Sequence, residues 1–354
     1  MTPDDPAWIA LDIGGANIKA AHSSSAARTL PFELWKRPDD LGQILANLAG
    51  TFPRVDRVAL TMTAELCDCY PTKSFGVIAV LDAVKEAFPD LPIEVWGIDG
   101  AFHDHASVKR TPLIAAASNW VALATYAARL VPEGPGILID VGTTTTDLIP
   151  LSDGRPAARG RTDTDRLQTG ELVYAGIRRT PVCALATELP HRGKPTGLAA
   201  EFFATTQDVY LTLGSIPPDP KDSATADGRP ATLAAARHRL ARMVGADNDG
   251  FSEADALAFS RAADECLLSR LQAAVDRACL GTVGRPRSAV VSGSGEFLAR
   301  DLARRILEPG GTIIGLREAW GAVASVAGCA YALLALARER FDPDSETDSE
   351  SVDS

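Results

Sequence analysis

The feature that most constrains the fold is a short motif that occurs twice, with Asp12 and Asp140 at equivalent positions 128 residues apart. Each copy is an apolar run with strand propensity that ends in the aspartate and turns at a glycine, in segments 12–17 and 140–147. Glycine permits the tight turn, which leaves backbone N–H groups and hydroxyls facing an approaching ligand. One such turn is equally well explained as an ordinary hairpin. Two copies instead predict two related halves that face each other across a phosphate-binding cleft.

A third glycine motif occurs late in the chain, where a strand predicted at 288–291 enters the turn 292–296 and opens a helix. Backbone can approach a flat or anionic ligand closely at such a turn, and the helix amino terminus presents N–H groups. A packing role explains an isolated turn of this kind better. Its position after both phosphate motifs favours a substrate or nucleoside pocket at Gly293, Ser294 and Gly295.

Length and composition predict two domains with a sizeable core, since the chain has 354 residues of which 46% are hydrophobic and 23% charged. We expect a first lobe at 1–130 and a second at 131–340, with an irregular subdomain inserted at about 190–250. The formal charge is −11, but the last thirteen residues hold six acids and no base. Because segment 341–354 has no apolar face to bury, it is predicted to be a disordered acidic tail.

Several classes of function are disfavoured by what the sequence lacks. No basic stripe is interleaved with aromatic residues, so we predict no nucleic-acid partner. No apolar run reaches the roughly 18 residues of a membrane helix and the amino terminus has no basic n-region, which predicts a cytoplasmic protein without a membrane partner. Six cysteines are spread too thinly for a disulfide framework. Cys67 and Cys69 lack a second pair at zinc spacing, which disfavours a metal site there.

Hydrophobic periodicity predicts a hairpin followed by crossover units in each half. The first half has strands at 7–12, 17–22, 29–36, 56–62 and 92–96, and helices at 40–50, 75–88 and 113–130. The second half begins with strands at 136–141, 145–151 and 155–160. It continues with helices at 231–244 and 253–280, a strand at 288–291, a helix to 307, a strand at 312–315 and a helix at 318–340.

The order of the three motifs resembles the phosphate-one, phosphate-two and adenosine motifs of the actin, sugar kinase and Hsp70 superfamily. This resemblance implies an α/β class protein with the duplicated actin-like ATPase fold, in which two lobes surround a central phosphate-binding cleft. The segments 143–147 and 170–182 resemble, more narrowly, the hydantoinase A and oxoprolinase family.

Five segments (11–19, 61–68, 96–100, 117–120 and 170–182) resemble the compact, tetrahydromethanopterin-linked one-carbon-transfer branch of that family, which makes the furan core of methanofuran. The resemblance implies a transferase that joins (aminomethyl)furanylmethyl diphosphate to the phenol oxygen of tyramine or glutamyl-tyramine and releases diphosphate. The implied partners are small molecules, namely a diphosphate and a phenolic amine. A homo-oligomer is left open.

The implied reaction mainly requires a stabilised diphosphate, because the furan ring shares the positive charge that develops on the reacting carbon. Asp12, Asp140 and Asp147 are the predicted Mg²⁺ ligands, largely through water. A solvated surface charge is the alternative for each arginine of the site. The predicted phosphate-binding residues are Gly14, Gly15, Ala16, Asn17, Lys19, Gly142, Thr143, Thr144, Thr145 and Arg178, with Arg179 as a further cation.

The phenol must lose a proton whose unperturbed pKa is about 10, which calls for a positioned base. Glu65 and Asp99 are the predicted catalytic residues, because both follow predicted strands whose ends should lie beside the cleft. An ordinary turn aspartate is the alternative for Asp99. Asn119 and Trp120 are predicted to line the substrate pocket, although a tryptophan on a helix is more often part of the core.

Two other kinds of function are left open by the sequence. In the first, the chain is an ATP-dependent kinase or an amide-ring hydrolase, with ATP as the cofactor and the turn 293–295 at the adenosine. In the second, it is a nucleotide-sensing or scaffold module that uses its acidic tail. Formation of ADP without a furan diphosphate would favour the first, and loss of a partner on truncation after Arg340 the second.

Overall fold

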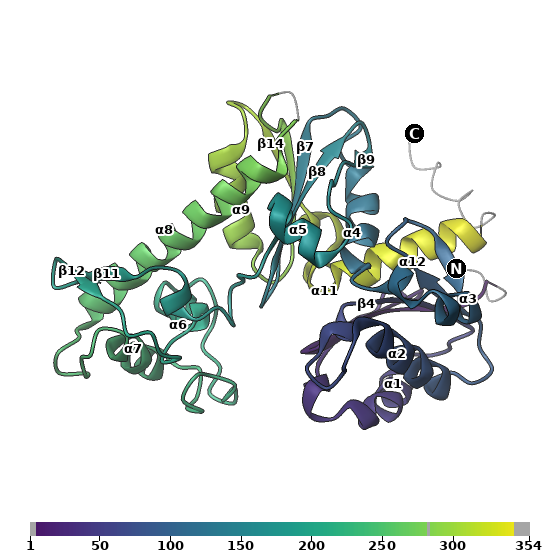
Figure 1. Ribbon diagram of the computed structural model, residues 1–354, viewed down its shortest axis with the longest axis horizontal. Helices are drawn as coiled ribbons and strands as arrows, with labels where there is room; N and C mark the ends of the chain where they lie inside the picture. The colour runs from purple at the N-terminus through teal and green to yellow at the C-terminus, as the bar shows by residue number, and fades with distance from the viewer. Residues whose placement is uncertain (1–4, 282–283, 343–354) are drawn as a thin grey trace, which may run out of the picture. The chain divides into compact units, whose positions relative to one another are not determined.

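The computed structural model describes residues 5–281 and 284–342, which form two compact units (Figure 1). The first unit contains segments 1–136, 151–165 and 314–354, and the second contains 137–150 and 166–313. The predicted division into 1–130 and 131–340 therefore needs correction, because the chain returns to the first unit after 313. The cause is α12 (Gly328–Phe341), which packs on the first sheet. The predicted tail lies outside the described residues from 343 onward.

The first unit is built on a six-stranded sheet of order β3-β2-β1-β4-β5-β6. Strand β1 pairs antiparallel with β2 and parallel with β4, and β4 is parallel to β5, which confirms the predicted hairpin followed by a crossover. The strands are β1 (Trp8–Ile13), β2 (Asn17–His22), β3 (Ala27–Pro31), β4 (Arg57–Met62), β5 (Ile93–Trp96) and β6 (Phe102–Asp104).

Both faces of this sheet are covered by helices. Ile9, Leu11 and Ile13 of β1 share one buried cluster with α1 (Leu41–Ala49) and α2 (Lys73–Ala87). Alternation along the strand turns Trp8, Ala10 and Asp12 to the opposite face. There α12 packs against β1 and against α4 (Asn119–Ala128). Asp12 is consequently 3% exposed although it ends a strand.

The second unit repeats this plan with the order β10-β8-β7-β13-β14, and β9 pairs with β8. In each sheet the first strand lies between its hairpin partner and a strand from much later in the chain. Ile137, Ile139 and Val141 of β7 share a core with α8 (Glu253–Ala278) and α9 (Glu296–Ile306). The duplication is the predicted actin-like ATPase fold. The strands are β7 (Gly136–Val141), β8 (Thr146–Ser152), β9 (Arg155–Pro156), β10 (Leu172–Val173), β13 (Ser288–Ser292) and β14 (Thr312–Gly315).

The segment predicted to be an inserted subdomain contains two short strands and two helices, which lie beside α8 in Figure 1. They are β11 (Glu188–His191), β12 (Lys194–Gly197), α6 (Thr206–Thr212) and α7 (Leu233–Arg242). The helices predicted at 231–244 and 253–280 are confirmed as α7 and α8. The other short elements are η1 (Leu34–Lys36), η2 (Pro38–Asp40), η3 (Ala64–Leu66), α3 (His105–Arg110), α5 (Asp163–Thr169) and η5 (Val182–Ala184).

Four predicted elements differ from the structure, the first being the strand predicted at 29–36, which ends at Pro31 and is followed by η1. The helix predicted at 113–130 is η4 (Pro112–Ala115) followed by α4, because Ala117 between them adopts a φ of 49°. The helix predicted at 318–340 is divided into α10 (Leu316–Trp320), α11 (Ala322–Val326) and α12, and Gly321 has a φ of 85° at the first break. The strand predicted at 155–160 extends only through β9.

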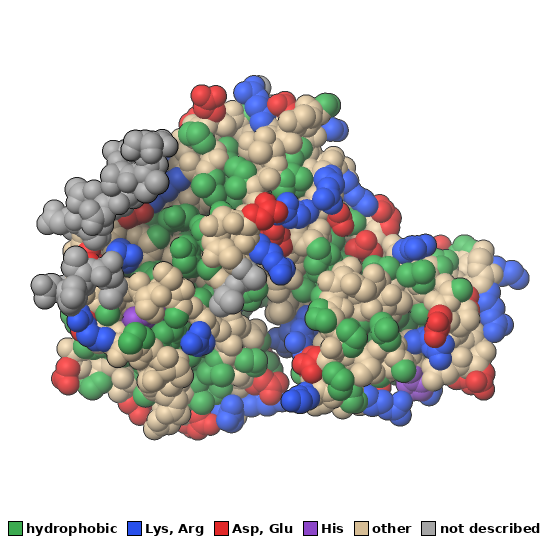
Figure 2. Space-filling view, turned by 180° about the vertical axis from the view of Figure 1, so that it is seen from behind, with side chains coloured by type: hydrophobic (Ala, Val, Ile, Leu, Met, Phe, Trp, Pro, Cys, Tyr) green, Lys and Arg blue, Asp and Glu red, His purple; other side chains and the backbone are tan. Residues whose placement is uncertain are grey.

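On the face shown in Figure 2, basic and acidic side chains are interspersed and do not form a basic stripe. Among the helices of the described segments, none combines the length and apolarity required to cross a bilayer.

Candidate active site

In the first unit several of the predicted site residues lie where β1 and β4 end. Asp12 is aligned with Thr61 across the parallel pair, and the Thr63 amide donates to the Ile13 carbonyl at 2.9 Å. Lys19 on β2 lies opposite Asp12 in the antiparallel register. The carboxyl ends of parallel strands meet at one sheet edge, so the hairpin loop of β1 and the segment after β4 are neighbours.

This first loop is tightly packed against the segment that follows β4. The Gly14 amide donates to the Asn17 carbonyl at 3.0 Å and closes the hairpin turn. A Cβ atom on Gly15 would lie 2.6 Å from Sγ of Cys67, so a larger residue at this position would require the Cys67 side chain to move. The carbonyl of Ala16 accepts from the Phe32 amide at 3.0 Å. Packing against Cys67 therefore fixes the loop.

Glu65 is the most unusual ionisable group of this edge. It lies in the single turn η3 directly after β4 and is 1% exposed. Among the described residues neither carboxyl oxygen has a hydrogen bond of good geometry, and the nearby backbone amides of Glu65 and Ala117 lower its pKa less than burial raises it. Burial raises the pKa of Glu65 to about 7, because the charged form loses its hydration. A carboxyl with this pKa is available both as a base and as an acid near neutral pH.

Two further residues, which the sequence did not indicate, tune this carboxyl. Nζ of Lys73 at the start of α2 lies 3.0 Å from Oδ2 of Asp163 at the start of α5. Repulsion by Asp163 raises the pKa of Glu65 and attraction by Lys73 lowers it, both less than burial does. The backbone of Glu65 is held by α2, since a Cβ on Gly76 would lie 2.4 Å from the Glu65 carbonyl oxygen.

Asp99 and Asn119 have local structural roles. Both carboxyl oxygens of Asp99 lie 3.0 Å from Nε2 of His103, and Oδ1 accepts from the Ala101 amide in the turn after β5. The side-chain oxygen of Asn119 accepts from the amide of Trp120 at 2.7 Å. These contacts match the alternative of a turn aspartate, and a catalytic role of Asp99 stays a prediction.

In the second unit segment 175–179 packs against the loop 142–145 and supports it. The Gly142 amide donates to the Thr145 carbonyl at 2.9 Å and closes the turn. The Thr143 carbonyl accepts from the amides of Arg178 and Arg179 at 3.1 and 3.0 Å. A Cβ on Gly176 would lie 2.6 Å from the loop backbone at Thr143. This support explains why the loop and segment 170–182 both carry the family resemblance.

The late glycine turn packs on the end of β7. The Ser292 hydroxyl donates to Oδ1 of Asp140, and the Gly295 amide donates to the Val141 carbonyl at 2.8 Å. Gly293 has a φ of 91°, and a Cβ there would lie 2.3 Å from the Val141 oxygen. Packing accounts for these glycines, and the predicted pocket at 293–295 stays a prediction. Ser292 is a contact of Asp140 that the sequence reading had not singled out.

Asp147 is held by a buried cation. Nη2 of Arg166 at α5 donates to Oδ1 of Asp147, and the two side chains are 3% and 14% exposed. The same nitrogen donates to the Glu171 carbonyl at 3.4 Å. This pairing gives Asp147 a structural partner, as Ser292 does for Asp140, and the role of both aspartates as metal ligands stays a prediction.

The side chain of Arg178 is hydrogen-bonded to the inserted subdomain. Its Nη2 donates to Oδ2 of Asp222, which also accepts from Nε2 of Gln207 at 2.9 Å. The Arg178 side chain is 36% exposed and that of Asp222 15%. The Arg178 side chain is therefore partly accessible to solvent, while its backbone amide is bonded to the loop 142–145.

The donor set can be compared with the predicted Mg²⁺. Within the described part of the chain no three His, Cys, Asp or Glu side chains cluster as a complete metal site. Mg²⁺ characteristically keeps several waters and takes one or two carboxylates together with substrate phosphates. Single aspartates at strand ends, such as Asp12 and Asp140, fit that mode of binding.

The two sheets and their hairpin loops are those of the actin-like ATPase fold, and comparison of the sequence with known proteins identifies the family. Residues 56–338 match the hydantoinase/oxoprolinase family, so the chain belongs to that family. A relative from Methanocaldococcus jannaschii, named (4-{4-[2-(gamma-L-glutamylamino)ethyl]phenoxymethyl}furan-2-yl)methanamine synthase, is 34% identical over 340 residues, covering 94% of this chain and 98% of the relative. A protein of the same name from Methanococcus vannielii is 28% identical over 211 residues, covering 58% of this chain and 92% of that protein.

Similar solved structures include the PilM–PilN type IV pilus biogenesis complex, with a TM-score of 0.48 and 12% identity over 93% of this chain and 97% of that chain. The activator of 2-hydroxyisocaproyl-CoA dehydratase from Clostridium difficile with bound ADPNP has a TM-score of 0.44 and 13% identity, covering 95% of this chain and 97% of that chain. The fold assignment itself rests on the strand order of the two sheets.

Proposed function

We propose that this protein is a synthase of methanofuran biosynthesis, a transferase that joins (aminomethyl)furanylmethyl diphosphate to a phenol and releases diphosphate. The observation that carries the proposal is the 34% identity to the furan-methanamine synthase, which extends over 94% of this chain and 98% of that relative. The relative's name describes a γ-glutamylated phenoxymethyl product, so γ-glutamyl-tyramine is the proposed acceptor.

Glu65 is the proposed base. In the reaction a bond forms between the phenol oxygen and the furan CH₂ carbon, and the bond from that carbon to the diphosphate oxygen breaks. The leaving diphosphate takes the electron pair, and the phenol proton passes to Glu65. A pKa of about 7 suits this transfer, because an ordinary glutamate would be too weak a base and the phenol is a weak acid.

The hairpin loops are the proposed diphosphate ligands. Their backbones are fixed by packing at Gly15 and Gly176, which provides preorganised hydrogen-bond donors for an anion. Mg²⁺, when bound with diphosphate, neutralises charge on the leaving group. In each unit one aspartate is a candidate to hold it, Asp12 at β1 of the first unit and Asp140 at β7 of the second.

The test is release of diphosphate and formation of the ether from the furan diphosphate and γ-glutamyl-tyramine, followed by mass spectrometry. Glu65→Gln should lower kcat by about 100-fold or more, in the range usual for a general base, while inorganic diphosphate still binds. The matched control is Glu94→Gln, at a half-buried glutamate of the same sheet that pairs with Arg57, and it should keep wild-type activity. ADP formation from ATP without any ether product would refute the proposal in favour of a kinase or ring hydrolase.

A further inference from the structure

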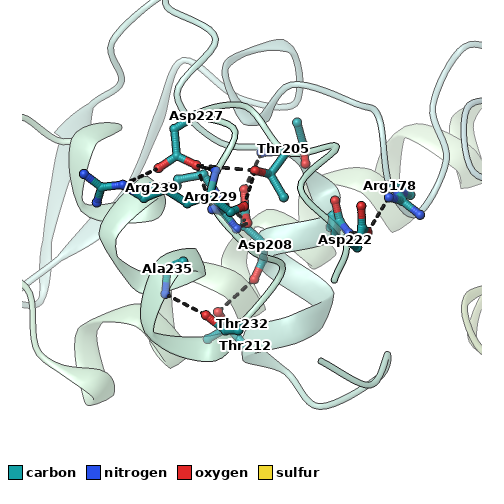
Figure 3. A network of polar contacts seen from close by, with 12 residues as sticks. Arg178, Thr205, Asp208, Thr212, Asp222, Asp227, Arg229, Thr232, Ala235 and Arg239 are labelled. Atoms are coloured by element: carbon teal, nitrogen blue, oxygen red, sulfur yellow. Dashed lines mark hydrogen bonds and ion pairs between the residues drawn. The ribbon is translucent and has the colours of Figure 1, made fainter. Parts of the chain in front are cut away.

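Within the second unit, polar contacts join Arg178 to Asp222, and a second group of contacts joins Asp208, Arg239 and Asp227 of the inserted subdomain (Figure 3). At the loop end, the Arg178 amide donates to the Thr143 carbonyl while its side chain donates to Asp222. At the subdomain end, the Thr206 hydroxyl donates to the Gly176 carbonyl at 2.7 Å. The subdomain thus contacts both the backbone and the side chain of the segment that supports this loop.

Asp222 is held by hydrogen bonds to its side chain and to its backbone. Its Oδ2 accepts from Gln207 at 2.9 Å, and its Oδ1 accepts from the Ala224 amide at 3.0 Å. Its own carbonyl accepts from the Ala231 amide at 2.8 Å. The ion pair with Arg178 is only partly buried, so solvent screening limits its contribution to stability, and the contact also restricts the orientation of the Arg178 side chain.

The helix α6, which carries Gln207, is held in place by a capping box and a buried ion pair. The next residue, Asp208, closes a capping box with Thr205 at the start of α6. Oδ1 of Asp208 accepts from Nε and Nη2 of Arg239 at 2.8 and 2.7 Å, and both side chains are 1% exposed. Asp227 accepts from Nη1 of Arg239 at 2.9 Å. Breaking such a buried pair is strongly unfavourable, so Asp222 and Gln207 rest on a scaffold with little freedom.

We propose that Asp222 is a positioning residue that orients Arg178 as the cation for the diphosphate of the substrate, an inference that rests on the proposed function. The contact between the two side chains uses one of the five N–H groups of a guanidinium, which leaves the fork geometry suited to phosphate oxygens. Holding the side chain in place before binding removes its ordering cost from the binding step.

The experiment is a double-mutant cycle in which inorganic diphosphate with Mg²⁺ is titrated calorimetrically into wild type, Asp222→Ala, Arg178→Met and the double variant. Asp222→Ala should weaken diphosphate binding by between about twofold and tenfold, the range for freeing one long side chain, and leave the KM for the acceptor unchanged. In the Arg178→Met background the same change should have no effect. The less disruptive Asp222→Asn should give an intermediate loss.

The matched control is Glu265→Ala, which removes the partner of Arg305 from a two-bond ion pair of 2.7 Å elsewhere in this unit and should leave diphosphate affinity unchanged. Additive losses in the cycle, or a lower melting temperature of Asp222→Ala with unchanged diphosphate affinity, would overturn the positioning role alone. Wild-type protein that fails to bind diphosphate or to form the ether would overturn the proposed function and this inference together.

Discussion

Glu65→Gln should remove a pH dependence of the free energy of unfolding that burial of this carboxyl creates in the wild type. The pKa of Glu65 is raised from 4.5 to about 7 in the folded protein. Between these values the unfolded chain has lost the proton that the folded chain retains, so ionisation favours unfolding as the pH rises. At 1.36 kcal/mol for each pKa unit, the penalty in the wild type grows to about 3 kcal/mol above pH 7 and is absent below about pH 4.

Glutamine cannot ionise, and the variant escapes this penalty. The free energy of unfolding of Glu65→Gln, relative to wild type, should therefore increase by about 3 kcal/mol between pH 4 and pH 8. Urea denaturation followed by tryptophan fluorescence is the appropriate assay, because all five tryptophans, at positions 8, 35, 96, 120 and 320, belong to the first unit together with Glu65.

Val80→Ala provides the control, since it removes buried apolar volume from α2 in the same unit without a titrating group. It should destabilise the protein by a similar amount at both pH values. A difference between Glu65→Gln and wild type that does not change with pH would refute the argument, because the buried carboxyl would then ionise as readily as in the unfolded chain. Loss of activity combined with greater stability at pH 8 is the expected pattern for a functional site.

Three further outcomes follow from the site. Asp163→Asn removes a repulsion and leaves the attraction of Lys73, so the pKa of Glu65 should fall and the acidic limb of the kcat/KM profile should move to lower pH; an unmoved limb would argue against this coupling. Arg166→Met should lower the free energy of unfolding by about 3 kcal/mol in urea denaturation, because Asp147 loses its buried partner, and Arg166→Met/Asp147→Leu should recover most of it. Gly76→Ala should displace Glu65 and lower kcat by up to about 100-fold in steady-state assays; wild-type turnover would show that the backbone yields.

The sequence predicted the parts of the fold that depend on local signals. The hairpins after β1 and β7 follow from an apolar run, an aspartate and a glycine turn, and α8 follows from a long periodic stretch. The predicted helix at 113–130 failed because Ala117 adopts a positive φ, which its side chain gives no reason to expect. The return of α12 to the first sheet depends on tertiary packing, which no local pattern encodes.

The candidate site was predictable to the same degree. Glu65 could be selected because it follows a buried strand, but its burial and raised pKa depend on α2 and on the distant Asp163. Asp147 was predicted as a metal ligand from its motif, which does not reveal its ion pair with Arg166. Arg178 was predicted from the sequence, but its ion pair with Asp222, which lies 44 residues away along the chain, carries no signal in a single sequence.

The two hairpins also show how duplication produces different chemistry from one motif. A segment packs against each loop and holds the backbone of the loop in place. The segment that does this differs between the two units. Behind the first loop lies Cys67, in the segment that also carries the buried acid Glu65. Behind the second lies Gly176, in the segment that carries the oriented cation Arg178. The proposed condensation removes a proton from a phenol and a diphosphate from a carbon, and the supporting segments of the two units differ in the kind of group that each could offer to it.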